Sequence, residues 1–218
     1  MSKLRFKITL SLDGYIAGPD QSVENPLGIG GSRLHEWAFA LAAFRKQLGM
    51  QGGEVNASTG VLEESVANIG ATIMGRNMFG GHAPGQSSVW RADQPWDGWW
   101  GKNPPFHHAV FVLTHHPRKT LELEGGTRFV FVTDGIESAL EQARQAAGGK
   151  DITLAGGAKA AQQYLKRGLV DEMELSLAPL LLGSGERLFE SVGSDLHGLK
   201  LVRTVATRSV VHLKFVRS

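Results

Sequence analysis

Two glycines followed directly by a helical pattern give the clearest chemical signal in this chain. Gly156 and Gly157 end a short apolar strand, and the helix that follows ends before Gly168. Glycine lets the backbone turn sharply and approach a ligand closely, and the first amides of a helix are unpaired and partly positive. The pattern favours an anionic ligand such as a phosphate, but a simple tight connection between strand and helix is an alternative explanation.

A second strand end carries a cation. Ile73 and Met74 lead into Gly75 and Arg76, so a guanidinium group follows immediately after a glycine. Arginine forms paired hydrogen bonds with phosphate oxygens. Two junctions of this kind strengthen the case for a bound phosphate, and the alternative for Arg76 is an ordinary solvated arginine.

Adjacent histidines occur twice, as His107–His108 and His115–His116. Neighbouring residues on a strand face opposite sides, and no cluster of carboxylates accompanies either pair. We therefore expect no metal site.

Composition narrows the class of protein. The chain has 218 residues, with 23 Lys and Arg against 21 Asp and Glu, and it has no cysteine. The near-neutral balance without a basic run argues against a nucleic-acid partner, and the lack of cysteine excludes disulfides and thiolate catalysis. No secretory signal opens the chain, and no apolar run approaches the roughly 20 residues that span a bilayer. We expect a cytoplasmic protein without a membrane partner, folded as one domain over residues 1–218.

The strands that must position these residues are marked by apolar patterns. Residues 4–10 alternate with period two, and residues 199–205 and 209–216 predict a closing antiparallel hairpin. The other expected strands are 71–74, 109–113, 129–132, 152–155 and 173–177. Because strands alternate with helices, we predict an α/β protein with a mainly parallel, twisted central sheet and an antiparallel C-terminal hairpin.

Helices are expected on both faces of this sheet. One apolar stripe runs from Leu34 to Leu48, and a second helix covers about residues 59–70. Asp134 is expected to cap a third helix, with Glu137 completing the capping box and Gly148 following its end.

Residues 80–107 follow neither period. Four of the five tryptophans lie in this segment, at positions 90, 96, 99 and 100, among glycines and prolines. Disordered segments are poor in aromatic residues, so we expect an ordered, lid-like insertion. The rings either line a flat aromatic substrate or anchor the insertion or a dimer contact.

Five motifs together resemble the dihydrofolate reductase-like family, and within it the reductase domain of bacterial riboflavin biosynthesis (the RibD C-terminal-like group). In chain order the motifs are Ser11–Gly18, Met74–Arg76, Val112–Thr114, Leu154–Ala158 and Leu182–Phe189. Their order and spacing match across nearly the whole chain. The resemblance implies a mainly parallel sheet flanked by helices, with NADPH across the carboxyl ends of the central strands. The general rule for open α/β sheets gives the same location.

The resemblance also implies roles for individual residues. Gly75 and Arg76 would meet phosphates on one side of the cofactor. Three further groups would cradle the pyrophosphate (Gly156, Gly157, Ala158), surround the adenosine 2′-phosphate (Thr114, His115, Arg118) and lie against the nicotinamide (Thr9, Ile16, Ala17). No carboxylate stands beside Thr114, which favours NADPH over NADH, although the Thr114 hydroxyl can equally satisfy its own turn.

The source of a proton is less defined. Folate reductases hold their pterin with a carboxylate on the first helix, and the matching stretch here reads Leu34-His35-Glu36-Trp37. The resemblance makes Glu36, or else His35, the candidate acid if its side chain faces the pocket, where apolar walls would raise a carboxylate pKa. Glu36 can instead be an ordinary first-turn partner of the helix dipole. Asp13, before a glycine in a turn, is expected to bond local backbone.

These observations predict an NADPH-dependent reductase that transfers hydride to a planar heterocyclic or conjugated small molecule, working as a homodimer. The protein would mainly position the cofactor and exclude water. Two alternatives are left open: a dinucleotide-binding module without turnover, and a reductase of the same fold with a flavin-type cofactor. No pair of basic groups for a substrate phosphate can be assigned, so the specific riboflavin-pathway substrate is not implied.

Overall fold

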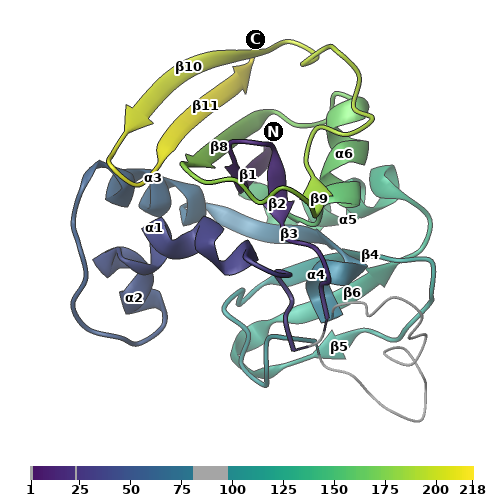
Figure 1. The fold of residues 1–218 in the computed structure, drawn as a ribbon. Coiled ribbons are helices and arrows are strands. Elements are labelled where there is room, and N and C mark those ends of the chain that lie inside the picture. The colour runs from purple at the N-terminus through teal and green to yellow at the C-terminus, as the bar shows by residue number, and fades with distance from the viewer. Residues whose placement is uncertain (1, 23, 81–97) are drawn as a thin grey trace.

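The computed structural model describes residues 2–22, 24–80 and 98–218 (Figure 1). Its main feature is a nine-stranded sheet in the order β10-β11-β8-β1-β7-β3-β4-β6-β5. The strands of this sheet are β1 (Leu4–Ser11), β3 (Ile69–Gly75), β4 (Ala109–Leu113), β5 (Leu121–Glu122), β6 (Arg128–Val132), β7 (Asp151–Gly156), β8 (Glu172–Ala178), β10 (Leu199–Ala206) and β11 (Val211–Arg217). The run from β8 to β6 is parallel, whereas β5, β11 and β10 pair antiparallel. The predicted α/β fold class, with its antiparallel C-terminal hairpin, is confirmed.

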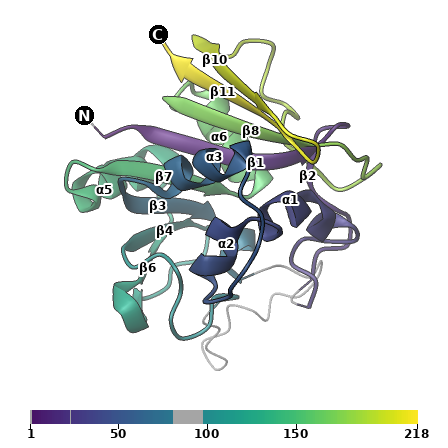
Figure 2. The same cartoon turned by 90° about the vertical axis from the view of Figure 1, so that its left-hand side faces the viewer.

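Helices lie on both sides of the sheet (Figures 1 and 2). α5 (Ile136–Ala147) and α6 (Ala158–Lys166) are on one side, and α1 (Glu36–Phe39), α2 (Ala42–Gln47) and α3 (Ala57–Val66) are on the other. A short 3-10 helix, η1 (Gly31–His35), leads into α1, and α4 (Arg76–Gly80) follows β3 directly. A separate two-stranded sheet joins β2 (Tyr15–Ala17) to β9 (Glu186–Arg187).

The alternation along β1 sends its side chains into two different surroundings. Phe6 and Leu10 are buried in the large apolar core that includes α5 and α6. Lys7 and Thr9 point to the other face, where Lys7 reaches α3 and Thr9 accepts a hydrogen bond from Trp37 of α1. The central strand therefore has an apolar side and a polar side, as its period-two pattern indicates.

The single helix predicted from Leu34 to Leu48 is wrong. Leu41 is extended, with ψ at 135°, and separates α1 from α2. The backbone there is held by Glu54, whose carbonyl accepts from Ala42 N at 2.9 Å and whose amide donates to the Ala40 carbonyl at 2.7 Å. The side chains of Leu34 and Leu41 are buried as the stripe predicted, but that of Leu48 is 59% exposed.

Two helix boundaries also differ. The helix expected over 59–70 ends at Val66, because Ile69 already belongs to β3. Asp134 does not cap α5: the cap position is Gly135, with φ at 103°, and no side chain caps this helix. The chain therefore enters the helix through a left-handed glycine, and the expected end at Gly148 is confirmed by its left-handed conformation.

The tryptophan-rich insertion lies largely outside the described residues, including Trp90 and Trp96. Of the described part, Trp100 packs edge-on against Phe106, with ring centroids 4.9 Å apart. Among the described residues, none of the helices has the length and apolar character needed to cross a membrane.

Candidate functional site

Parallel pairing brings the predicted phosphate-binding residues to one edge of the sheet. Met74 on β3 pairs with Gly156 on β7, so the two glycine junctions are adjacent. A Cβ built on Gly75 would lie 3.6 Å from the Gly157 amide nitrogen. Two motifs separated by some eighty positions in the chain therefore lie side by side, with glycine rather than a side chain at the partly exposed positions 75 and 157.

The Gly156–Gly157 turn puts two residues without side chains at the start of α6. A cis peptide bond joins the two glycines, and Gly156 has φ at 125°, a conformation that side chains disfavour. A Cβ built on Gly157 would meet no atom of the described residues within 4 Å, so within that part of the chain open space adjoins this residue. No side chain caps the start of α6, which leaves its first amides for a ligand. The residues present thus fit an anionic cofactor group.

The predicted contacts to a 2′-phosphate lie beyond the end of β4. Thr114 is buried, and its Oγ1 accepts a hydrogen bond from the His116 amide at 3.1 Å, so it does serve its own turn. His115 is exposed. The Arg118 guanidinium stacks on Phe131 and Phe79, at 5.2 and 5.9 Å from the ring centroids, which holds it in place.

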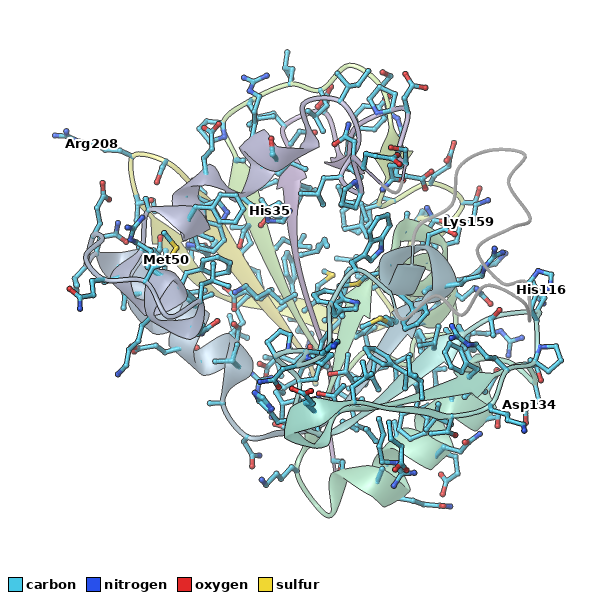
Figure 3. All side chains as sticks on the ribbon, turned by 90° about the horizontal axis from the view of Figure 1, so that it is seen from below. His35, Met50, His116, Asp134, Lys159 and Arg208 are labelled. Carbon is cyan, nitrogen blue, oxygen red and sulfur yellow. The ribbon has the colours of Figure 1, made fainter. Side chains whose placement is uncertain are left out.

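Two further cations, Lys159 and Lys7, were not identified from the sequence. Arg76, which the sequence did identify, is the first residue of α4 and is half-buried. Burial lowers the pKa of its guanidinium group. Lys159 lies in the first turn of α6 and is exposed. Figure 3 shows Lys159 and His116 on one side of the molecule and His35 on the other. The run Gly-Gly-Ala-Lys places Lys159 beside the turn, and this spacing was the available signal.

The second cation is Lys7, on the face of β1 that looks toward α1 and α3. Its Nζ donates to Ser65 Oγ at 2.9 Å and lies 5.6 Å from the Trp37 ring centroid. Burial lowers the pKa of Lys7 to about 8, and the nearby charge of Glu174 opposes this shift in part. Nothing in the local sequence pattern distinguishes Lys7 from a surface lysine.

The predicted nicotinamide contacts are buried around β2. Ile16 and Ala17 are almost fully buried, and Thr9 accepts a hydrogen bond from Trp37 Nε1 at 3.3 Å. Pairing of β2 with β9 brings the first and last of the five motifs together. These contacts give the site a wall built from chain segments at opposite ends of the sequence.

Asp13 ties these segments to each other. Its carboxylate accepts hydrogen bonds from the amides of Leu182 at 3.2 Å and Gly183 at 2.7 Å. A hydrogen bond with Ser11 is the largest cause that lowers the Asp13 pKa, to about 2. The bonded backbone is distant in the chain rather than local, so Asp13 is structural in a different way from the one expected.

The first helix presents Trp37, and not Glu36, to the sheet. Glu36 is exposed, whereas Trp37 is 5% exposed and packs edge-on against His212. His35 is half-buried; burial lowers its pKa, and the charge of Lys7 adds to this effect. A role for Glu36 as an acid requires that its carboxyl group be buried, and it is exposed.

The paired histidines have structural partners. His107 Nδ1 is 2.9 Å from the Gly125 carbonyl, and His108 Nε2 is 2.7 Å from Thr72 Oγ1. Within residues 2–22, 24–80 and 98–218, no three His, Asp or Glu side chains are grouped closely enough to hold a metal ion.

Solved structures share this fold. A putative riboflavin biosynthesis protein from Shewanella sp. PV-4 superimposes with a TM-score of 0.58 and 22% identity, over 100% of this chain and 99% of that one. Dihydrofolate reductase from Enterococcus faecalis, solved with NADP(H), gives a TM-score of 0.51 and 12% identity, over 99% and 96% of the two chains. The chain is thus an α/β protein with the dihydrofolate reductase-like fold.

Sequence comparison then gives the family. The profile of the RibD C-terminal domain matches residues 2–213, and the chain belongs to this family. The uncharacterized protein YyaP of Bacillus subtilis (strain 168) is 32% identical over 107 residues, which cover 47% of this chain and 56% of YyaP. The chain spans about half the length of the curated relatives it matches.

Proposed function

We propose that this protein is an NADPH-dependent reductase that transfers hydride to a planar conjugated or heterocyclic small molecule. The observation that carries the proposal is the Gly156–Gly157 turn at the uncapped start of α6, with open space beside Gly157. A helix start of this kind binds phosphate through backbone amides and the helix dipole. Family membership supports the same cofactor class.

The preference for NADPH rests on charge. Arg118, fixed on two aromatic rings, and Lys159, in the first turn of α6, are cations at the same edge as the glycine turn. A 2′-phosphate binds to cations, whereas the free ribose hydroxyl of NADH is usually held by a carboxylate. The bound dinucleotide would supply the hydride.

The role of the chain's own residues is to hold and shield the reacting ring. Ile16 and Ala17 would form an apolar wall for the nicotinamide, and the pairing of β2 with β9 would hold this wall in place. Thr9, fixed by the Trp37 indole, would support the other side. Holding two reactants in one orientation supplies a large part of a rate enhancement without an acid or base.

Titration with the two reduced dinucleotides tests this function. We expect tryptophan fluorescence to give an NADPH affinity at least about tenfold higher than that for NADH. Replacing Arg118 with Met should lower NADPH affinity by about 1.5 to 3 kcal/mol, the scale of a charge-assisted hydrogen bond, and leave NADH affinity nearly unchanged. The exposed Arg208, on the distant hairpin turn, offers the matched control Arg208→Met (Figure 3).

The outcomes separate the alternatives. Equal affinity for NADPH and NADH would refute the 2′-phosphate assignment. Tight NADPH binding without oxidation by any acceptor would favour a dinucleotide-binding module, and a bound flavin in the purified protein would favour the flavin-type reductase.

A further inference from the structure

The ammonium group of Lys7 lies on the same face of β1 as the predicted nicotinamide contact Thr9, two residues before it. Lys7 and Thr9 are on the same strand and the same face of β1, and residues two apart on a strand are about 6.5 to 7 Å apart. The Trp37 indole connects them, since its Nε1 donates to Thr9 while its ring faces the Lys7 ammonium group. The floor behind this part of the site is therefore cationic.

The neighbouring carboxylate of Glu174 offsets the positive charge of Lys7 only in part. Its cross-strand neighbour Glu174 is paired with Arg203 at 3.1 Å, and the hydrogen bond that Lys7 donates goes to the neutral hydroxyl of Ser65. Lys7 also lines a small cavity of about 20 Å³ with Glu174, enough for one water molecule. The titratable or charged groups near Lys7 are Arg5, His35, Glu64, Glu172, Glu174 and His212.

The candidate carboxylate is in the wrong place to offset Lys7. Glu36 is exposed on α1, whereas His35 and Lys7 are both partly buried on this side of the sheet. A substrate that must become a cation before it accepts hydride would be destabilised by a positive charge behind it. A substrate that gains negative charge would be stabilised, because a fixed positive charge favours negative charge that develops in the transition state.

We propose that Lys7 selects for conjugated carbonyl acceptors, such as enones and quinones, by stabilising the oxyanion that hydride transfer creates. This inference rests on the proposed reductase function. Hydride from the dihydronicotinamide bonds to an acceptor carbon, and the π electron pair moves onto the carbonyl oxygen. The dinucleotide leaves oxidised, and a proton from water completes the reduced product. Lys7 acts through space from behind Thr9, and so it is a positioning residue.

Steady-state oxidation of NADPH with menadione and with dihydrofolate tests the proposal. We expect the wild-type protein to reduce menadione faster than dihydrofolate. Lys7→Met should lower kcat for menadione by about tenfold or more. This loss is smaller than the loss of about 10²- to 10³-fold that follows removal of a group in direct contact with an oxyanion, because Lys7 acts from a distance. The Kd for NADPH should be unchanged. Lys7→Arg, which keeps the charge, should restore most of kcat. Lys3→Met removes an exposed lysine of the same segment and should behave as wild type.

The dependence of kcat on pH is a second measurement, and it would not change if Lys7 served only to stabilise the fold. Since the pKa of Lys7 is about 8, its positive charge is lost as the pH rises through that value, and kcat for menadione should fall there. This fall should be absent in Lys7→Arg, because arginine keeps its charge. Thermal melting of each variant confirms that it is folded.

Three results would overturn the inference: unchanged menadione kcat in folded Lys7→Met, faster turnover of dihydrofolate than of menadione, or NADPH binding without reduction of menadione. In each of these cases NADPH still binds, so the cofactor part of the proposed function stands. Failure to bind NADPH would instead refute the proposed function itself.

Discussion

At the scale of single residues, the two glycines of the Gly156–Gly157 turn differ in backbone conformation and in surroundings. Gly156 has φ at 125°, which a side chain would strain, and a Cβ there would lie 3.6 Å from Met78 Sδ. Gly157 has an ordinary φ of −62°, and the protein leaves its Cβ position open. Backbone conformation thus accounts for the first glycine, and under the proposed function ligand approach would account for the second.

This difference makes Gly157→Ala a clean test of the cofactor site. We expect a stability loss below about 1 kcal/mol, because alanine fits the backbone but is a poorer helix cap than glycine. NADPH affinity should fall at least about tenfold, because the methyl group occupies the space of the pyrophosphate. Calorimetric titration and thermal unfolding measure the two quantities.

Gly156→Ala is the matched comparison. It should cost about 1 to 3 kcal/mol of folding free energy through the strained φ. If Gly157→Ala kept full affinity for NADPH, the turn would be only a connection between strand and helix.

At the scale of elements, a buried histidine attaches α3 to the sheet. His212 on β11 is fully buried; its Nε2 is 2.9 Å from Ser58 Oγ in α3, and its Nδ1 is 2.8 Å from Ser176 Oγ on β8. Burial, helped by the charges of Lys7 and Arg203, lowers the pKa of His212 from 6.5 to about 4. A neutral imidazole is therefore part of the packing of α3.

This attachment predicts acid sensitivity. The unfolded chain protonates this histidine below about pH 6.5, but the folded protein does so only near pH 4. The stability that His212 contributes is present above pH 6.5 and is lost as the pH falls toward 4, by up to about 3 kcal/mol. Denaturant unfolding between pH 4 and 7.5 should show this loss.

Substituting His212 by Gln should remove that part of the pH dependence, and substituting the exposed His116 by Gln should not. Parallel pH dependences for wild type and His212→Gln would contradict the assignment.

Helices and strands that follow from a local apolar pattern could be predicted from the sequence. Those whose ends depend on contacts with distant residues could not. The continuous apolar run of β4 and the alternation of β1 identified both strands, because burial imposes those periods. The break at Leu41 depends on backbone hydrogen bonds from Glu54, which no local signal announces. In the candidate site, the glycines and the arginine at the ends of β3 and β7 could be predicted to lie together, because parallel strands end at the same edge of a sheet. Lys7 could not, because burial of a lone lysine depends on which helix covers it.

At the scale of the whole molecule, we propose that a second copy of the chain contacts the edge strand β10. Leu201 and Val202 on the edge strand β10 are 52% and 60% exposed. A β-bulge between Leu201 and Arg203 interrupts the edge, so we expect contact through side chains rather than one continuous sheet.

Sedimentation analysis tests the expected homodimer. We expect a mass of twice 23.5 kDa for the wild type and a shift toward the monomer for Val202→Lys. Val55→Lys, at a site that is 80% exposed on the loop before α3, is the matched control and should remain dimeric. A wild-type protein that sediments as a monomer at micromolar concentration would rule out this contact.

The position of β1 in the middle of the sheet has a consequence for how the chain is made. Its neighbours on the two sides are β7 and β8, and its flanking backbone amides bond Asp151 and Asp171, at sequence separations of 148 and 167 residues. During synthesis β1 emerges first, yet both of its partners emerge after residue 150. Phe6 and Leu10 therefore have no neighbouring strands to pair with until β7 and β8 have left the ribosome. Contacts this distant in sequence make folding slow, and the waiting strand is a natural binding site for chaperones.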